Sequence, residues 1–161
     1  MSQELTTTLV VNGREVRRRA AGHLTLLQWL RDVAGVHDVK YGCGEGVCGA
    51  CTVLVDGQAV SSCLVPAARL DGRSIQTVSG LLQDGRLNDL QEAFLDRGAA
   101  QCGFCTPGML MAATELLASG EPLDEQRIRE GLHGNLCRCT GYGPIVKAVE
   151  AVARSRGMDR L

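Results

Sequence analysis

The chain has 161 residues, enough for one domain or two small ones, and its aromatic content of only 3% excludes a large aromatic-rich core. Its net charge of -1, with acidic and basic residues interleaved, argues against a nucleic-acid-binding protein, which would carry a basic patch. No apolar run approaches the roughly 18 residues of a membrane span, and the first residues lack the order of a signal peptide. We therefore expect a cytoplasmic protein whose eight cysteines stay reduced and serve as metal ligands more readily than as disulfides.

The chain begins with a predicted hairpin followed by a helix. Residues 5–11 are rich in Thr, Val and Leu and predict a strand, and residues 15–19 predict its return. The intervening Asn12-Gly13 is typical of a type I′ turn, because both turn positions require positive φ. In residues 25–33 the apolar residues recur at helical spacing, which predicts a helix that ends near Gly35.

A second hairpin completes the first half of the chain. Residues 52–55 and 58–61 predict two short strands around an Asp56-Gly57 turn, and residues 74–78 predict a last strand. Two hairpins and one crossing helix indicate a β-grasp, ferredoxin-like domain. We assign it to residues 1–78.

Four cysteines interrupt this domain between its helix and its second hairpin. Cys43, Cys48 and Cys51 have the spacing C-x4-C-x2-C, and Cys63 follows after eleven further residues. This is the plant-type [2Fe–2S] ferredoxin signature. Zinc is the main alternative, but zinc ligands usually come as two short pairs. The backbone N–H groups that would stabilise the sulfurs come from the glycine-rich loop containing Gly42, Gly44, Gly46 and Gly49.

The second half of the chain predicts helices. Residues 79–86 form a linker, and residues 87–161 predict an all-α four-helix bundle domain, so the fold class is α+β. Asp124 is the expected N-cap of the third helix. The predicted apolar faces are Leu87, Leu90, Phe94 and Leu95 in the first helix; Met109, Leu110, Ala113, Leu116 and Leu117 in the second; residues 124–132 in the third; and residues 145–152 in the fourth.

A second set of four cysteines lies in this helical half of the chain. Cys102 and Cys105 form a C-x2-C pair, and Cys137 and Cys139 form a C-x-C pair. This spacing is less diagnostic, and it leaves a cluster, a zinc site and redox-active thiols open. We call Cys43, Cys48, Cys51 and Cys63 the first cysteine group, and these four the second.

The second group repeats a short pattern that leads into a helix. Thr106 and Pro107 follow Cys105, and Thr140 and Pro144 follow Cys139. Thr favours an N-cap and Pro the first helical turn. We therefore expect the second group to lie where two helix N-termini meet, whereas the first group lies among glycine N–H groups. This difference predicts different reduction potentials for two clusters.

Three segments together resemble the small iron–sulfur subunit of molybdenum hydroxylases, the xanthine oxidase family. They are CGEGVCGACTVLVDG at 43–57, QCGFCTPGM at 101–109 and GNLCRCTGY at 134–142. Relatives in this family include aerobic carbon monoxide dehydrogenase, quinoline and isoquinoline oxidoreductases and 4-hydroxybenzoyl-CoA reductase. The resemblance implies an N-terminal plant-ferredoxin-like domain, a C-terminal four-helix domain and a [2Fe–2S] cluster on each cysteine group.

The resemblance also implies the partners of the chain. A large subunit would carry the molybdopterin cofactor and the substrate chemistry, and a medium subunit would carry FAD, in a heterotrimer or a dimer of heterotrimers. The family also contains complexes without a flavin subunit. Electrons would enter at the second cysteine group and leave through the first, with Gln101 and Cys139 against the pterin.

Two other classes of function fit parts of the sequence. A stand-alone two-cluster ferredoxin would be a monomer with a fully polar surface, whereas a subunit would expose apolar residues near Gln101 and Cys139. A zinc-binding interaction module would contain no iron. The chain shows no paired-carboxylate or Ser-His-Asp set that could activate a substrate, so we expect an electron carrier whose partner performs the chemistry.

Overall fold

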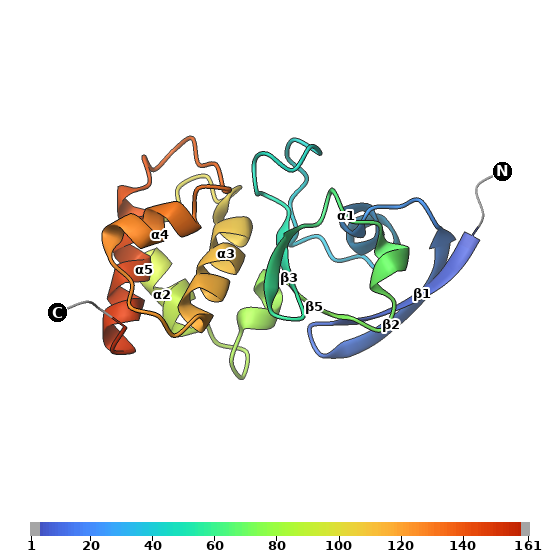
Figure 1. Ribbon diagram of the computed structural model, residues 1–161, viewed down its shortest axis with the longest axis horizontal. Helices are drawn as coiled ribbons and strands as arrows, with labels where there is room; N and C mark the ends of the chain where they lie inside the picture. Colours follow the sequence, from blue (N-terminus) through green and yellow to red (C-terminus); the bar gives the residue numbers. More distant parts are fainter. Residues whose placement is uncertain (1–3, 159–161) are drawn as a thin grey trace.

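A five-stranded sheet lies beside a group of four α-helices in the computed structural model, which describes residues 4–158 (Figure 1). Residues 1–3 and 159–161, the outer ends of the two predicted domains, lie outside the described residues. The sheet with its short helix occupies one end of the molecule and helices α2 to α5 the other. Helix α3 lies next to strand β3 at the junction (Figure 1).

The sheet has the strand order β2-β1-β5-β3-β4. Strands β1 and β5 pair in parallel and the other neighbours are antiparallel, so the sheet is mixed. This confirms the α+β class. The strands are β1 (Glu4–Val11), β2 (Arg14–Ala21), β3 (Thr52–Val55), β4 (Gln58–Ser61) and β5 (Ser74–Gln76).

Both predicted hairpin turns are confirmed. Asn12 and Gly13 have φ of 49° and 78°, and Asp56 and Gly57 have φ of 49° and 86°. Positive φ at both central positions matches the right-handed twist of the flanking strands. The last strand, β5, ends at Gln76 and is therefore shorter than predicted.

The two edge strands of the sheet are protected in different ways against pairing with a further strand. β2 is one edge strand, and its exposed residues include Arg14, Arg17, Arg18 and Arg19. β4 is the other edge, and the carboxylate of Glu115 in α3 accepts the N–H of Ala59 at 2.8 Å.

The predicted helix at residues 25–33 is only partly α-helical. Thr25 caps α1 (Leu26–Gln28) through a reciprocal capping box with Gln28. The chain then continues as a π-helical turn, Trp29–Val33, in which the N–H of Ala34 bonds to the carbonyl of Trp29. Gly35, with φ of 73°, ends the helix as expected.

Four further α-helices follow the sheet, and short 3-10 turns at Ala67–Leu70 and Val78–Leu81 precede them. Asn88 caps the first through a capping box with Gln91, and Asp124 caps the third, as predicted. The helices are α2 (Asp89–Asp96), α3 (Thr106–Ala118), α4 (Glu125–Gly131) and α5 (Gly143–Ser155).

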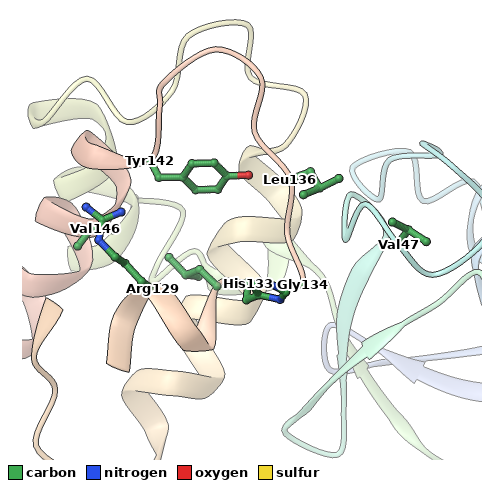
Figure 2. A pocket seen from close by; sticks show the side chains of 8 residues that line it. Val47, Arg129, His133, Gly134, Leu136, Tyr142 and Val146 are labelled. Carbon is green, nitrogen blue, oxygen red and sulfur yellow. The ribbon is translucent and has the colours of Figure 1, made fainter. Parts of the chain in front are cut away.

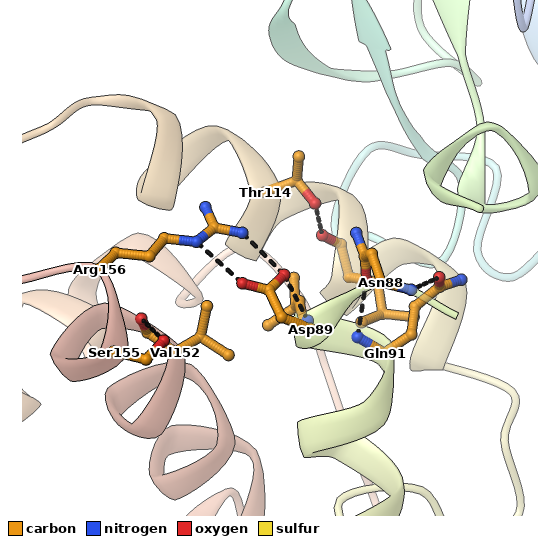
Figure 3. Close-up of polar contacts among 9 residues, drawn as sticks. Asn88, Asp89, Gln91, Thr114, Val152, Ser155 and Arg156 are labelled. Atoms are coloured by element: carbon orange, nitrogen blue, oxygen red, sulfur yellow. Dashed lines mark hydrogen bonds and ion pairs between the residues drawn. The ribbon is translucent and has the colours of Figure 1, made fainter. Parts of the chain in front are cut away.

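Helices α2 to α5 share one apolar core. It includes Phe94 from α2, Met109 from α3, Ile128 from α4 and Val149 from α5, all almost fully buried. A bidentate ion pair between Asp89 and Arg156 joins the start of α2 to the end of α5 (Figure 3). A second core, beneath the sheet, contains the buried Trp29.

Two leucines predicted for the core are on the surface instead. Leu87 is 39% exposed because it precedes α2, and Leu95 is 62% exposed. Leu90 and Phe94 are four residues apart and share the buried face, whereas Leu95 lies about 100° farther around the helix. Leu116 of α3 is only half-buried.

Within residues 4–158, no helix has both the length and the apolar character needed to cross a membrane.

We expect Phe94→Ala to lower the free energy of unfolding by about 3 to 5 kcal/mol, because it opens a cavity in the helical core. Leu95→Ala is the matched control in the same helix, and it should change stability by no more than about 0.5 kcal/mol. Denaturant titration followed by circular dichroism measures both. Equal losses in the two variants would contradict the assignment of the buried face.

Candidate metal centres

The β3–β4 hairpin and the preceding loop bring the first cysteine group together. Cys51 lies directly before β3 and Cys63 shortly after β4, and both are buried. The Ser62 hydroxyl donates to the carbonyl of Cys51 at 2.7 Å and holds the two ends of the hairpin together. Cys48 is half-buried and Cys43 is exposed.

Backbone N–H groups face the sulfurs of the first group, as predicted. The Cys43 sulfur accepts from the N–H groups of Glu45 and Cys48 at 3.3 and 3.4 Å, and the Cys48 sulfur accepts from the N–H of Cys43 at 3.3 Å. Gly44 and Gly46, with φ near 75°, allow the chain to turn its N–H groups inward. These donors, that of Glu45 foremost, lower the pKa of Cys43 to about 6, so this loop stabilises a thiolate.

Close packing around this loop requires two of its glycines. A Cβ on Gly42 would lie 2.6 Å from the Cys48 sulfur, and one on Gly46 would lie 2.3 Å from Leu64. The loop therefore fits an anionic metal–sulfur group in two respects: it has space for sulfur and it supplies donors.

The inner thiols of the first group have a different environment. Burial, followed by the hydrogen bond and charge of Cys51, raises the pKa of Cys63 to about 11. A metal bound here would displace a proton from that thiol, because thiolate is the ligand form.

The second cysteine group comes from two segments that are more than 30 residues apart. Cys102 and Cys105 precede α3, and Cys137 and Cys139 lie between α4 and α5. The sulfurs of Cys102 and Cys139 are 3.5 Å apart. Burial, and then a hydrogen bond that the Cys105 thiol donates to Cys137, raises the pKa of Cys105 to about 12. The fold therefore brings these thiols together as two contacting pairs, Cys102 with Cys139 and Cys105 with Cys137.

The two threonines do not cap helices as predicted. Cys105 is the N-cap of α3 and Tyr142 is the N-cap of α5, and neither position has a side-chain cap bond. Thr106 is already the first helical residue, and Thr140 lies before the N-cap. Pro107 and Pro144 do occupy the first helical turns, as expected.

Thr140 and Tyr142 instead surround Cys137. The Thr140 hydroxyl is 3.1 Å from the Cys137 sulfur, and the Thr140 N–H points at the same sulfur from 3.5 Å. The Tyr142 hydroxyl accepts the N–H of Cys137 at 2.9 Å. Burial raises the pKa of Cys137, but the two bonds from Thr140 oppose it and the net pKa is lowered.

Asn135 links the two cysteine groups, and the sequence analysis missed it. Its buried side-chain amide donates to the Gly49 carbonyl at 2.9 Å and to the Thr52 hydroxyl at 3.2 Å. The next N–H, that of Leu136, donates to the Cys48 carbonyl at 2.9 Å. The only sequence signal was a polar residue two positions before Cys137.

Helix α3 also packs against the Gly49 carbonyl, through Gly108. A Cβ on Gly108 would lie 2.2 Å from the Gly49 carbonyl oxygen, and a Cβ on Gly49 would lie 2.4 Å from the Gly134 carbonyl oxygen. The backbone segments at Gly49, Gly108 and Gly134 therefore meet so closely that neither Gly49 nor Gly108 could carry a Cβ atom. The segments that carry the first and second cysteine groups are therefore packed directly against each other.

The two residues that the resemblance places against the pterin are both exposed. Gln101 precedes Cys102, and Cys139 lies beside Cys102. Their contact with a pterin stays a prediction.

An apolar cavity of about 470 Å³ lies between the first cysteine loop and the helices. In Figure 2 the Tyr142 ring points toward Leu136, and Val47 of the first loop lies across from Leu136. Val146 and Leu132 contribute to the inner wall.

Comparison with known proteins matches both halves of the chain. Residues 9–79 match the family described as 2Fe-2S iron-sulfur cluster binding domain, and residues 77–150 match the [2Fe-2S] binding domain family. The chain is 53% identical to the nicotine 6-hydroxylase small subunit of Paenarthrobacter nicotinovorans, over 86% of this chain and 84% of that subunit. It is 47% identical to the xanthine dehydrogenase iron-sulfur-binding subunit of Escherichia coli O157:H7, over 92% and 94%.

A solved structure has the same fold. Quinoline 2-oxidoreductase from Pseudomonas putida 86 contains a chain that superposes with a TM-score of 0.90 at 42% identity. The match covers 98% of this chain and 99% of that one.

We expect Gly108→Ala to destabilise the protein and lower its metal content. Alanine normally stabilises a helix by about 1 kcal/mol relative to glycine, but here its Cβ would collide with the Gly49 carbonyl, and such overpacking costs about 1 to 3 kcal/mol. Gly134→Ala is the control, because a Cβ there meets nothing within 4 Å. Denaturant midpoints and iron analysis measure the effect. A Gly108→Ala protein as stable as the control would refute this close contact.

Proposed function

Because the chain belongs to the small [2Fe–2S] subunits of the molybdenum hydroxylase (xanthine oxidase) family, we propose that its two cysteine groups bind two [2Fe–2S] clusters. The observation that carries this proposal is that the thiols of each group contact one another in pairs, with backbone N–H donors aimed at the sulfurs of Cys43 and Cys137. The proposed ligands are Cys43, Cys48, Cys51 and Cys63 for the first cluster and Cys102, Cys105, Cys137 and Cys139 for the second.

The chain is the electron-transfer subunit of a molybdopterin-dependent oxidoreductase. The molybdopterin and the FAD belong to other subunits of such enzymes, so the substrate chemistry takes place on a partner. When bound, each cluster accepts and releases one electron. The cysteines of this chain would hold the two clusters, and the bonds from the buried Asn135 would help to set the separation between them.

We assign the second cysteine group to the entry of electrons and the first group to their exit. Each group has cysteines at the surface, Cys102 and Cys139 in the second and Cys43 in the first, so each could face a partner. Cys51 and Cys63 are buried on the inner side of the first group. Gln101 and Cys139 form the proposed pterin contact, and their exposure supports it.

The surface supports a subunit more than a stand-alone ferredoxin. Phe104 and Leu136, next to the second cysteine group, are 48% and 53% exposed. Tyr41, Val47 and Leu64 around the first group are also exposed. Apolar side chains around both sites are unfavourable in a free monomer and favourable when a partner covers them. We propose a large molybdopterin subunit over the second group and a medium FAD subunit near the first, in a cytoplasmic heterotrimer or dimer of heterotrimers.

We further propose two domains within the chain. Residues 1–78 form the β-grasp, ferredoxin-like domain, 79–86 the linker, and 87–161 a four-helix [2Fe–2S]-binding domain. The two family matches, which change over at residues 77–79, support this division. So do the separate apolar cores beneath the sheet and among the helices.

Iron and sulfide analysis of the purified complex, with EPR after dithionite reduction, tests this function. We expect four irons and four sulfides per chain and two distinct signals, and zinc or a single cluster in this chain would refute the proposal.

In Cys105→Ser one signal should be lost or altered while the other is unchanged, and Cys48→Ser should affect the other signal. Both substitutions affecting the same signal would contradict the assignment of ligands to two groups.

We expect Phe104→Asp and Leu136→Asp to weaken association with the large subunit by about tenfold or more, because each places a charge in an apolar contact. Leu95→Asp is the control, since Leu95 is at least as exposed but lies on α2, away from the segments that carry the cysteines. Co-purification with a tagged large subunit measures the effect. An equal loss of co-purification in the control would contradict the proposed contact at Phe104 and Leu136.

A further inference from the structure

We propose that the Thr140 hydroxyl donates a hydrogen bond to the Cys137 sulfur and thereby raises the reduction potential of the second cluster alone. The proposal rests on the proposed function, because it takes Cys137 as a cluster ligand. Thr140 touches no substrate or cofactor in this scheme. It acts through Cys137 and is a positioning residue.

The geometry holds Thr140 against Cys137 at two atoms. Its hydroxyl oxygen is 3.1 Å and its backbone nitrogen 3.5 Å from the Cys137 sulfur. The N–H of Tyr142 donates to the same hydroxyl oxygen at 3.1 Å. This bond fixes the Thr140 side chain in the orientation that faces the sulfur.

The direction of the hydrogen bond follows from the chemistry of the two groups. In a free thiol either the sulfur or the hydroxyl could donate. A cysteine that ligates a metal is a thiolate and carries no proton. The Tyr142 N–H already occupies one acceptor site of the hydroxyl oxygen, and the single hydroxyl proton remains available. In the cluster-bound protein the hydroxyl is therefore the donor and the sulfur the acceptor.

The first cysteine group has no equivalent donor among residues 4–158. The hydrogen bonds that reach its sulfurs come from backbone N–H groups or from its own cysteines. A side-chain O–H bond is therefore a property of the second group. It can be removed by substituting the side chain.

The sign of the effect follows from the charge on the sulfur. Reduction adds one electron to the cluster and makes its ligands more electron-rich. A donor stabilises the reduced form more than the oxidised form, which raises the potential. The Thr140 hydroxyl would therefore make the second cluster a better electron acceptor than N–H donors alone would.

Redox titration of the purified complex, monitored by EPR, tests this inference. Thr140→Val keeps the shape of the side chain and removes the hydroxyl, whereas Thr140→Ser keeps the hydroxyl. We expect Thr140→Val to shift the reduction equilibrium of one signal about tenfold toward the oxidised form, or about 59 mV lower for a one-electron couple. The signal that shifts should be the one altered in Cys105→Ser, and Thr140→Ser should restore its potential.

Thr114→Val is the matched control, because the Thr114 hydroxyl donates to the Leu110 carbonyl within α3 (Figure 3). It should leave both potentials unchanged. An unchanged potential in Thr140→Val, an equal shift in Thr140→Ser, or a parallel shift of both signals would overturn the inference. These results would leave four irons and two signals intact, so they are distinguishable from failure of the proposed function.

Wild-type protein offers a second measurement if Thr140→Val loses the second cluster. Pulsed EPR of the reduced complex in H2O and in D2O detects exchangeable protons near each cluster. The inference requires a rapidly exchanging proton coupled to the second cluster, because a hydroxyl exchanges faster than a buried amide. Its absence would overturn the inference.

Discussion

The carbonyl group of Gly49 is the point on which the arrangement of the two cysteine groups depends. It accepts hydrogen bonds from the side chains of Asn135 and Thr52, and from the Thr52 N–H. Gly108 lies against it, where no Cβ would fit. One oxygen atom therefore connects the first cysteine loop, the start of β3, the start of α3 and the segment before Cys137. Because all these partners are buried or backbone groups, the contact has little freedom to adjust.

This contact helps to set the position of the two cysteine groups relative to each other. Each cysteine group has its own short-range donors, but the relative position of the groups depends on long-range bonds. Asn135 and Leu136 supply these bonds from one segment, and Cys137 follows directly. A shift of that segment would therefore move Cys137 and the carbonyls of Cys48 and Gly49 together. These bonds therefore oppose any change in the separation of the two cysteine groups.

The sequence predicted the features that depend on neighbouring residues. Both hairpin turns and the Asp124 cap follow from local spacing, and the fold reproduces them. Leu95 was misplaced because a helix beginning at Asp89 turns it away from the core. The role of the Thr140 hydroxyl was missed because Thr140 was assigned to a helix cap, although its partner Cys137 is only three residues away. Asn135 was missed because its partners, Gly49 and Thr52, lie more than 80 residues away in the sequence. A residue's contacts across the chain leave no periodic pattern in the sequence.

The edges of the sheet bear on how the chain behaves before it meets its partners. An unpaired strand invites a second copy to add its own strand, and arginines along an edge oppose this through like-charge repulsion. In β2 such repulsion would come from Arg14 and Arg17 to Arg19, while Glu115 already occupies an N–H of β4. Growth of the sheet from copy to copy is thereby discouraged at both ends.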